Sequence, residues 1–184
     1  MCEVAESILS GRVWVLKDRQ GDLIENIDTD QIFHNAFLHI TEMDKMGEHA
    51  LGNLEGWKDF PRKAKPGDII IAGRNFGAGS SRQQAVDCFL SLRVRAIIAS
   101  SFGAIYFRNA VNSGFPVLKC PEIKPFVEKG ILETGDEIRV DLLSGEAQII
   151  GKKMPLQFVP MSEVQYDIYA AGGLYNYGKI RSRD

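Results

Sequence analysis

Apolar and polar positions follow a regular succession of short blocks through the middle of the chain. Residues 68–72, 94–100 and 116–119 are β-branched or otherwise apolar runs, which are typical of buried strands. Between them, residues 81–92 and 104–111 repeat apolar side chains at helical spacing. Strand, helix, strand, helix, strand is the order found in parallel βαβ units. The pattern therefore predicts a parallel sheet with helices packed on it.

The two ends of the chain add strands of another kind. Residues 11–17 alternate in part and predict a strand. Residues 136–142 and 147–150 flank a Ser-Gly turn at residues 144–145 and predict an antiparallel hairpin. The expected fold is therefore α/β, with short parallel βαβ units and added antiparallel strands.

The remaining segments are less regular. Residues 28–30 are expected to form a polar turn, residues 42–51 a short helix, and residues 52–67, rich in charge and turn residues, a loop or flap. Ser162 is placed to cap a final helix, which two glycines end after Ala171.

The composition suits one domain over residues 1–184. Hydrophobic residues make up 45% of the chain, charged residues 25%, and the net charge is -2. This balance does not draw the chain to nucleic acid or to an anionic membrane surface. No apolar run approaches the roughly 20 residues of a membrane span, and the N-terminus lacks the pattern of a signal peptide. We therefore expect a cytoplasmic protein, in which any anion recognition is local.

The cysteines indicate a reducing compartment. Cys2, Cys88 and Cys120 form neither a C-x-x-C pair nor a cluster with histidine. An iron–sulfur cluster usually needs several thiolates, so this chain alone is not expected to hold one. Cys88 and Cys120 lie in apolar runs and are expected to be buried structural thiols.

A stretch rich in glycine and serine, residues 73–82, lies between a predicted buried strand and a predicted helix. Open α/β sheets bind ligands at such places, and the free N–H groups of a helix N-terminus attract carboxylate or phosphate. Ser80 and Ser81 supply hydroxyl groups, and the guanidinium of Arg82 can hold a carboxylate through two hydrogen bonds. A turn followed by a helix cap, with Arg82 in solvent, fits the composition equally well. The arginine beside two serines at the end of a strand favours an anion-binding loop.

Three familiar loop motifs do not fit this stretch. A Walker loop requires Gly-Lys-Ser/Thr, and the stretch contains no lysine. A dinucleotide fingerprint that begins at Gly77 and Gly79 needs a third glycine where Arg82 stands. A G-x-S-x-G nucleophile elbow is excluded because Ser80 is followed by Ser81 and Arg82.

Several segments resemble the aconitase superfamily. Residues 75–82 (N-F-G-A-G-S-S-R) are similar to its N-F-G-x-G-S-S-R-E-H loop, and residues 28–32 (D-T-D-Q-I) to its D-T-D-x-I segment. Residues 96–102 (A-I-I-A-S-S-F), Asn109 and residues 114–116 (G-F-P) are similar to further blocks. The chain length is similar to that of the separate small subunits of 3-isopropylmalate dehydratase and homoaconitase. The resemblance implies the swivelling β/β/α domain.

The resemblance also implies roles for residues of the loop. Ser80 matches the serine that acts as the catalytic base in this family, working as an alkoxide. Ser81 and Arg82, together with Gly79, match contacts to the substrate carboxylate. The implied reaction removes a proton from the carbon beside a carboxylate, eliminates the hydroxyl group and rehydrates the neighbouring carbon.

Other residues of the similar segments are expected to support this site. Asp30 matches an acidic residue that positions Arg82 or the loop, although a turn-capping aspartate explains it equally well. Thr29 and Asn75 lie within the matching segments and are expected to act as supporting residues.

The resemblance further implies a division of labour between two chains. A large partner subunit would carry a [4Fe–4S] cluster whose open iron acts as a Lewis acid. The small subunit would close over that cluster with its loop, in a heterodimer or heterotetramer. No cofactor and no metal ligand is assigned to this chain.

The sequence departs from the family pattern at three places. Gln83-Gln84 stand where the family has Glu-His, which leaves any supporting role of this pair open. Ala78 takes a position often filled by cysteine. His39 stands where homoaconitase-like members carry arginine and isopropylmalate-type members an apolar residue. His39 is a candidate for contact with the substrate, and an ordinary surface histidine is the somewhat favoured alternative.

The expected function is the isomerisation of a hydroxy di- or tricarboxylic acid by dehydration and rehydration. Isopropylmalate is the leading substrate, and homoaconitate or a methylated malate is the alternative. Outside the enzymes, a binding module that senses a carboxylate is the competing hypothesis.

Overall fold

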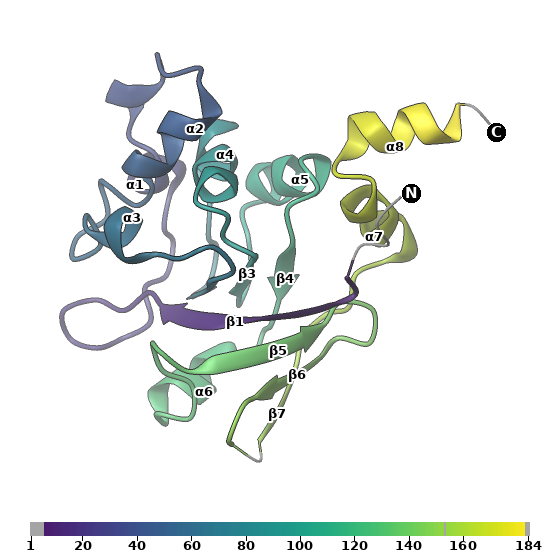
Figure 1. Ribbon diagram of the computed structural model, residues 1–184. Helices are drawn as coiled ribbons and strands as arrows, with labels where there is room; N and C mark the ends of the chain where they lie inside the picture. Colours follow the sequence, from purple (N-terminus) through teal and green to yellow (C-terminus); the bar gives the residue numbers. More distant parts are fainter. Residues whose placement is uncertain (1–5, 153, 183–184) are drawn as a thin grey trace.

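The structure, a computed structural model, describes residues 6–152 and 154–182. Their strands form a seven-stranded sheet in the order β4-β3-β2-β1-β5-β6-β7 (Figure 1). Strands β1 to β4 pair in parallel, and β5 to β7 pair antiparallel. The expected α/β fold, with parallel βαβ units and added antiparallel strands, is confirmed. The strands are β1 (Ile8–Val15), β2 (Ile69–Ala72), β3 (Ala96–Ala99), β4 (Val117–Lys119), β5 (Glu137–Asp141), β6 (Glu146–Ile149) and β7 (Pro155–Gln157).

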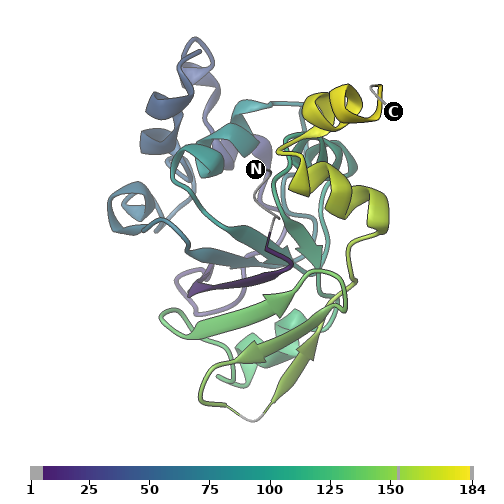
Figure 2. The same ribbon diagram turned by 45° about the vertical axis from the view of Figure 1, so that its right-hand side comes forward.

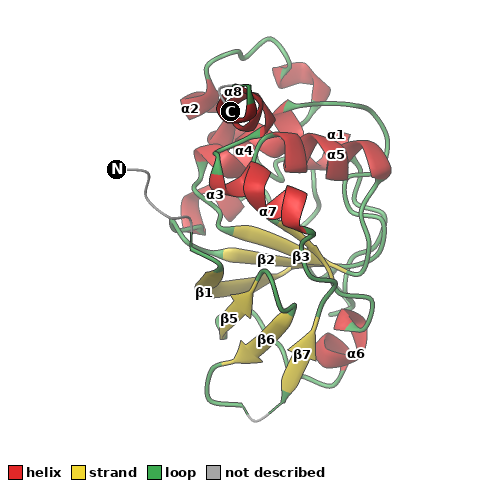
Figure 3. Cartoon of the chain, turned by 90° about the vertical axis from the view of Figure 1, so that its right-hand side faces the viewer, coloured by secondary structure: helices red, strands yellow, loops and turns green. Residues whose placement is uncertain are grey.

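Most helices cover one face of the parallel half of the sheet. In Figure 3, α4 and α5 lie above β2 and β3, whereas α6 lies beside β7 on the other side. Figure 2 shows α7 and α8 beside α5 at the C-terminal end. Among the described residues, no helix has the length and apolar composition needed to cross a lipid bilayer. The helices are α1 (Thr29–Ile32), α2 (Met43–Met46), α3 (Phe60–Lys63), α4 (Gln84–Ser91), α5 (Ala104–Asn112), α6 (Ile123–Glu128), α7 (Glu163–Ala170) and α8 (Leu174–Arg181), with 3-10 turns η1 (Asn35–Phe37) and η2 (Gly47–His49).

Strand β1 joins the two halves of the sheet. Its second half pairs with β2, where Val13 lies opposite Ile69. Its first half pairs with β5, where Leu9 lies opposite Val140. Because one long strand serves both neighbours, the antiparallel half turns away from the parallel half, as Figure 1 shows.

Alternation along the parallel strands sends side chains into two hydrophobic cores. In β2, Ile70 and Ala72 face the core under α4 and α5, and Ile69 and Ile71 face the core between the sheet halves and α6. All four are fully buried. A strand covered on both faces needs apolar residues at every position, which explains the continuous apolar run in the sequence.

The N-terminal third contains more helix than the sequence predicted. Residues 28–30, expected as a turn, supply the cap and first turn of α1. The Asp28 side chain accepts a hydrogen bond from the Gln31 amide, and the Gln31 side chain accepts one from the Asp28 amide. The single helix expected over residues 42–51 is also wrong, because the chain changes from α2 to the 3-10 turn η2 at Gly47.

Residues 52–67, expected as a loop or flap, form an anchored part of the first core. They contain α3, and Leu54 and Phe60 are buried. The indole N–H of Trp57 donates to the Lys17 carbonyl oxygen at 3.0 Å. The segment therefore packs against the first core at several points instead of standing away from it.

The buried carboxylate of Asp68 ties this segment to β1. It accepts hydrogen bonds from Arg12 Nη2 at 2.7 Å, from Trp14 Nε1 at 2.6 Å and from the Lys65 amide at 2.8 Å. Burial raises the pKa of Asp68, but the hydrogen bonds from Arg12, Lys65 and Trp14 outweigh burial, so the pKa is lowered overall. The start of β2, which carries the serine loop at its other end, is thereby held in place.

Hydrogen bonds at a helix cap and a glycine conformation determine where the two C-terminal helices begin. Ser162 caps α7 through a reciprocal pair of hydrogen bonds with Gln165, as predicted. The final helix of the chain is α8 rather than α7, because Gly173, at φ 119°, redirects the backbone into a new helix. The sequence pattern also missed α6, which contains Pro125, and β7, which is three residues long and begins with Pro155.

Candidate active site

The two motif-bearing segments lie side by side beyond the carboxyl end of β2. The amides of Gly77 and Ala78 donate to the Ile27 carbonyl oxygen at 2.7 and 3.2 Å. The Thr29 amide donates to the Ala78 carbonyl oxygen at 2.9 Å, and Asp28 and Ala78 form a parallel bridge. The D-T-D segment and the serine loop are thus paired as two short strands would be, which fixes their relative position.

Asn75 holds the start of the loop. Both Asn75 and Asn26 adopt left-handed backbone conformations, with φ of 59° and 55°, and asparagine tolerates this region better than most residues. Asn75 Nδ2 donates to Asn26 Oδ1 at 3.1 Å, and the Asn75 amide donates to Ser101 Oγ at 2.9 Å. The side chain predicted to support the site therefore shapes the backbone of the loop.

Gly77 lets the loop pass directly over an aromatic cluster. Its φ is +74°, and a Cβ there would lie 2.5 Å from Tyr106 Cβ and 2.6 Å from Tyr106 Cδ2. Tyr106 is buried between Phe76, at 5.3 Å between ring centroids, and Phe102, at 6.4 Å. The position of the loop is therefore determined by its contact with the ring of Tyr106, which is itself packed between two other aromatic rings.

Ser80, the predicted base, lies next to Thr29. The two hydroxyl oxygens are 3.0 Å apart. Thr29 is 2% exposed, whereas Ser80 is exposed at the surface. Gly79, at φ +94°, passes over Thr29, and a Cβ at Gly79 would lie in ordinary contact with Thr29 Oγ1, at 3.6 Å. Since a hydrogen bond to a charged form favours that form, a Thr29 hydroxyl that donates to Ser80 would stabilise a negative charge on its oxygen.

Arg82 forms an ion pair with Asp30. Arg82 Nη1 donates to Asp30 Oδ1 at 2.7 Å and to the Phe33 carbonyl oxygen at 3.1 Å. Arg82 Nε is buried and has no hydrogen-bond partner among the described residues. Only one of the three guanidinium nitrogens is therefore tied by hydrogen bonds to the protein in the described structure.

The carboxylate of Asp30 is kept ionised. Its pKa is lowered, first by the hydrogen bond from Arg82 and then by the Asn35 amide, which outweigh partial burial. Two further groups approach its other oxygen: Asn53 Nδ2 at 3.0 Å and His34 Nε2 at 3.9 Å. Each oxygen of Asp30 thus has a hydrogen-bond donor or a cationic group beside it.

The backbone of the serine loop offers unpaired donors. Helix α4 begins at Gln84 rather than at Ser81, so the expected helix N-terminus lies several residues beyond Ser80. Instead, the four amides of residues 79–82 make no hydrogen bond within the described part of the chain. Successive free N–H groups form concave sites for anions. The loop retains the capacity to bind an anion, but through its own amides more than through the helix.

The residues that follow Ser80 connect the loop to α4 and α5. The Ser81 carbonyl oxygen accepts a hydrogen bond from Asn109 Nδ2 at 3.3 Å. Gln83 Nε2 donates to Asp87 Oδ1 and to Ser113 Oγ, both at 2.8 Å. At this departure from the family pattern, Gln83 therefore fastens the end of the loop to the scaffold.

His39 lies outside this network. It is exposed after the turn η1, and its Nδ1 is 3.0 Å from the Ala36 carbonyl oxygen. No contact among the described residues links it to the serine loop. A contact between His39 and the substrate stays a prediction.

The described cysteines are structural. Cys88 and Cys120 are fully buried in different cores, as predicted. Burial raises the pKa of the Cys88 thiol far above its usual value and that of Cys120 to about 11. Cys2 lies outside the described residues. Within the described ranges, no group of three or more histidine, cysteine, aspartate or glutamate side chains is arranged to hold a metal ion.

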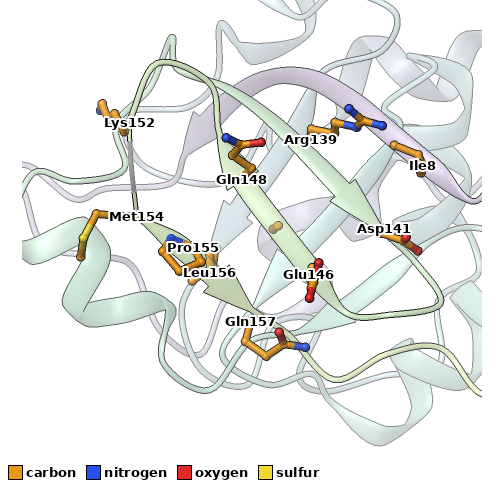
Figure 4. A pocket seen from close by; sticks show the side chains of 11 residues that line it. Ile8, Arg139, Asp141, Glu146, Gln148, Lys152, Met154, Pro155, Leu156 and Gln157 are labelled. Carbon is orange, nitrogen blue, oxygen red and sulfur yellow. The ribbon is translucent and has the colours of Figure 1, made fainter.

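A separate open groove of about 760 Å³ lies on the antiparallel half of the sheet (Figure 4). Its wall comes from β1, β5, β6 and β7 and from the turn before β7, with Arg139, Glu146 and Gln148 on the outer face. None of its lining residues belongs to the serine loop or to the D-T-D segment.

Comparisons with known proteins connect this chain to one family. The model of the aconitase C-terminal domain matches residues 18–122, which contain both motif segments. The chain is 35% identical to the 3-isopropylmalate dehydratase small subunit of Nautilia profundicola, over 94% of this chain and 95% of that protein. It is 38% identical to the 2,3-dimethylmalate dehydratase small subunit of Eubacterium barkeri, over 86% and 92%. The crystal structure of 3-isopropylmalate dehydratase from Methanocaldococcus jannaschii matches with a TM-score of 0.81 and 33% identity, over 96% of each chain.

Proposed function

The chain belongs to the aconitase C-terminal domain family, among the small subunits of 3-isopropylmalate dehydratases, and we propose that it supplies the base and the carboxylate-binding arginine of a two-chain hydro-lyase. Residues 1–184 act in this proposal as one swivelling domain that closes over a large partner subunit. The observation that carries the proposal is the joint placement of Ser80 beside Thr29 and of Arg82 beside Asp30.

The exposure of Ser80 supports a site that two chains complete. A serine hydroxyl in water is a weak base, because at neutral pH almost none of it is present as the alkoxide. Donors act much more strongly where water is excluded. In this chain alone Ser80 is open to solvent, so a second surface has to cover it before the donors around it gain their full effect.

Each side chain has a separate task in the proposed reaction. Ser80, as an alkoxide, removes the proton from the carbon beside one substrate carboxylate while the hydroxyl group leaves the adjacent carbon. On rehydration the hydroxyl group adds to the carbon that lost its proton, and Ser80 returns the proton to the carbon that lost the hydroxyl group. Thr29 and the free amides of residues 79–82 stabilise the negative charge on the serine oxygen. Arg82 binds the substrate carboxylate through its guanidinium nitrogens that make no hydrogen bond to the described residues, while Asp30 fixes the guanidinium through Nη1. Asn75 keeps the loop in shape.

The iron–sulfur cluster belongs to the partner in this proposal. The two described cysteines are buried on opposite sides of the sheet, so they do not fit as joint ligands of a cluster. When bound in the partner subunit, the cluster supplies a Lewis acid for the leaving hydroxyl group. The proposed contribution of this chain is limited to proton transfer and carboxylate binding.

The proposed substrate is 3-isopropylmalate, as the name of the Nautilia profundicola relative indicates, which would place the enzyme in cytoplasmic leucine biosynthesis. The relative named for 2,3-dimethylmalate, at 38% identity, makes that smaller acid the second candidate. Both acids carry two carboxylates and one hydroxyl group, so the same serine and arginine serve either.

Reconstitution with the large subunit tests the proposal. The two chains are mixed anaerobically and given 3-isopropylmalate or 2,3-dimethylmalate in separate reactions, and the unsaturated intermediate is followed by its ultraviolet absorbance. We expect turnover only when both chains are present, with higher kcat/KM for 3-isopropylmalate. A complex that forms and turns over neither acid, or tight binding of a diacid by this chain alone, would contradict the proposed function.

A further inference from the structure

The carboxylate of Asp30 has two oxygens, and the loop uses only one of them. Oδ1 accepts the hydrogen bond from Arg82. Oδ2 faces Asn53, whose Nδ2 donates to it at 3.0 Å and also lies 3.4 Å from the Asp30 carbonyl oxygen. Asn53 comes from the segment between η2 and α3, which neither sequence motif covers. A third segment of the chain therefore reaches the arginine through Asp30.

The backbone turn before Asn53 directs the side chain of Asn53 toward Asp30. Leu51 is fully buried and has a φ of 57°, in the left-handed region that a leucine rarely adopts. Its amide donates to the Ile32 carbonyl oxygen at 2.8 Å, at the end of α1. Leu54, also buried, holds the far side of the turn. The turn is thus fixed on both sides of Asn53 and points its amide at Asp30.

We propose that Asn53 is a positioning residue for Arg82, acting through Asp30. The inference rests on the proposed function, because it assigns to Arg82 the binding of a substrate carboxylate. A carboxylate held at one oxygen can rotate about its Cβ–Cγ bond, and the guanidinium paired with it would follow. The Asn35 amide also donates to Oδ1, and the side-chain amide of Asn53 adds a hydrogen bond to Oδ2, so both oxygens are fixed and Oδ1 stays directed at Arg82.

The charged groups around Asp30 show why an uncharged amide suits this position. Arg82 and His34 are the cationic or titratable side chains that face the carboxylate, and the Asn35 amide is a further donor. His34 Nδ1 accepts a hydrogen bond from the Ala36 amide at 3.2 Å, so in the neutral ring the proton is on Nε2, the atom 3.9 Å from Asp30 Oδ2. Asn53 supplies the short hydrogen bond to Oδ2 without a charge that competes with Arg82.

The test compares three variants in the complete two-chain enzyme: Asn53→Ala, Asn53→Asp and, as a matched control, Asn112→Ala. Asn112 is exposed at the end of α5 and its side chain makes no hydrogen bond within the described residues. Steady-state kinetics with 3-isopropylmalate give kcat and KM. In parallel, carbon-13 NMR of the isolated chain gives the pKa of Asp30, a readout that a general loss of stability does not change.

We expect Asn53→Ala to raise KM about two- to tenfold, the range for one lost hydrogen bond, with kcat within about twofold, because ground-state binding and transition-state binding fall together. The pKa of Asp30 should rise in Asn53→Ala and rise further in Asn53→Asp, where two carboxylates meet. If KM and the pKa of Asp30 both stay at the values of the Asn112→Ala control, or if kcat alone falls, the inference is wrong. If the wild-type complex shows no turnover, the proposed function has failed, and the pKa of Asp30 alone decides on the role of Asn53.

Discussion

The substitution Gly77→Ala tests how the scaffold sets the serine loop. It adds one methyl group at a position where φ is +74° and where the new carbon would lie 2.5 Å from Tyr106 Cβ and closer still to the ring. Tyr106 is 1% exposed and packed against Phe76 and Phe102, so it has no free space to enter. Either the loop rises or the aromatic cluster shifts.

Two terms give the size of the effect. A left-handed conformation costs a non-glycine residue roughly 1–2 kcal/mol. Forcing extra volume into a packed interior costs about 1–3 kcal/mol more. Together we expect Gly77→Ala to lower the free energy of unfolding by about 2–5 kcal/mol, which corresponds to a fall in Tm of roughly 5–20 °C for a chain of this size.

Gly21→Ala is the matched control. Gly21 has a φ of +90°, but no atom lies within 4 Å of the position of a Cβ. It therefore carries the backbone strain and the change in unfolded-chain entropy without the clash. Urea unfolding of the three proteins, followed by circular dichroism, gives the free energy of unfolding of each. The difference between the two variants isolates the overlap with Tyr106.

The same variant has a functional consequence. Because the loop from Gly77 to Arg82 is continuous, a raised Gly77 moves Ser80 away from Thr29. We expect kcat of the reconstituted complex to fall for Gly77→Ala at temperatures where the protein is folded, and to stay unchanged for Gly21→Ala. Equal destabilisation by the two variants, or an unchanged kcat in Gly77→Ala, would refute the view that contact with Tyr106 positions the loop.

Three further substitutions probe separate contacts. Asp68→Asn removes the buried carboxylate beside Arg12 and is expected to lower the free energy of unfolding by about 2–4 kcal/mol at pH 7. Because folding lowers the pKa of Asp68, the difference from the wild type should shrink as the pH falls below about 4. Thr29→Val, which keeps the shape of the buried side chain, is expected to lower kcat about tenfold by removing a donor to Ser80. Arg82→Lys keeps the charge but loses the planar fork, and is expected to raise KM for 3-isopropylmalate about 10- to 100-fold.

Exposed positions of the same residue types provide the controls. Asp44→Asn, Thr41→Val and Arg108→Lys change side chains for which the described structure shows no side-chain hydrogen bond, and they should behave as the wild type does. An Asp68→Asn protein as stable as Asp44→Asn at pH 7 would contradict the first expectation. An unchanged kcat in the threonine variant, or an unchanged KM in the lysine variant, would contradict the other two.

The parallel half of the sheet could be predicted because strands buried on both faces have continuous apolar runs in the sequence. β2 and β3 are apolar at every position, and helical spacing marks α4 and α5 between and after them. The hairpin of β5 and β6 could also be predicted from the sequence, since buried and exposed residues alternate along both strands. The role of β1 as the strand that joins the two halves could not be predicted, because pairing with two different strands leaves no pattern in eight residues.

The motif segments identified the right neighbours but not their supports. The two segments were grouped from similarity, and Asp30 was considered as a partner of Arg82, which it contacts in the structure. The contact between Ser80 and Thr29 was not predicted. Tyr106 lies far from these segments in the sequence, so no local pattern could connect it with the loop.

The first residue of α4 could not be predicted from the spacing of apolar residues. Apolar spacing marks the helix from Ala85 onward but says nothing about where its first turn begins. Arg82 forms an ion pair with Asp30, Gln83 donates to Ser113, and the helix begins only at Gln84.

The most direct measurement of the central claim is kcat for Ser80→Ala in the reconstituted two-chain enzyme, beside Ser144→Ala as a control in a remote surface turn. Size-exclusion chromatography first verifies that each variant assembles with the large subunit. If Ser80 is the base, kcat falls about 10²- to 10⁴-fold, the usual contribution of a general base, with KM nearly unchanged, and Ser144→Ala keeps the wild-type rate. A Ser80→Ala complex that assembles and retains a kcat close to that of the control would contradict the assignment of the base to this chain.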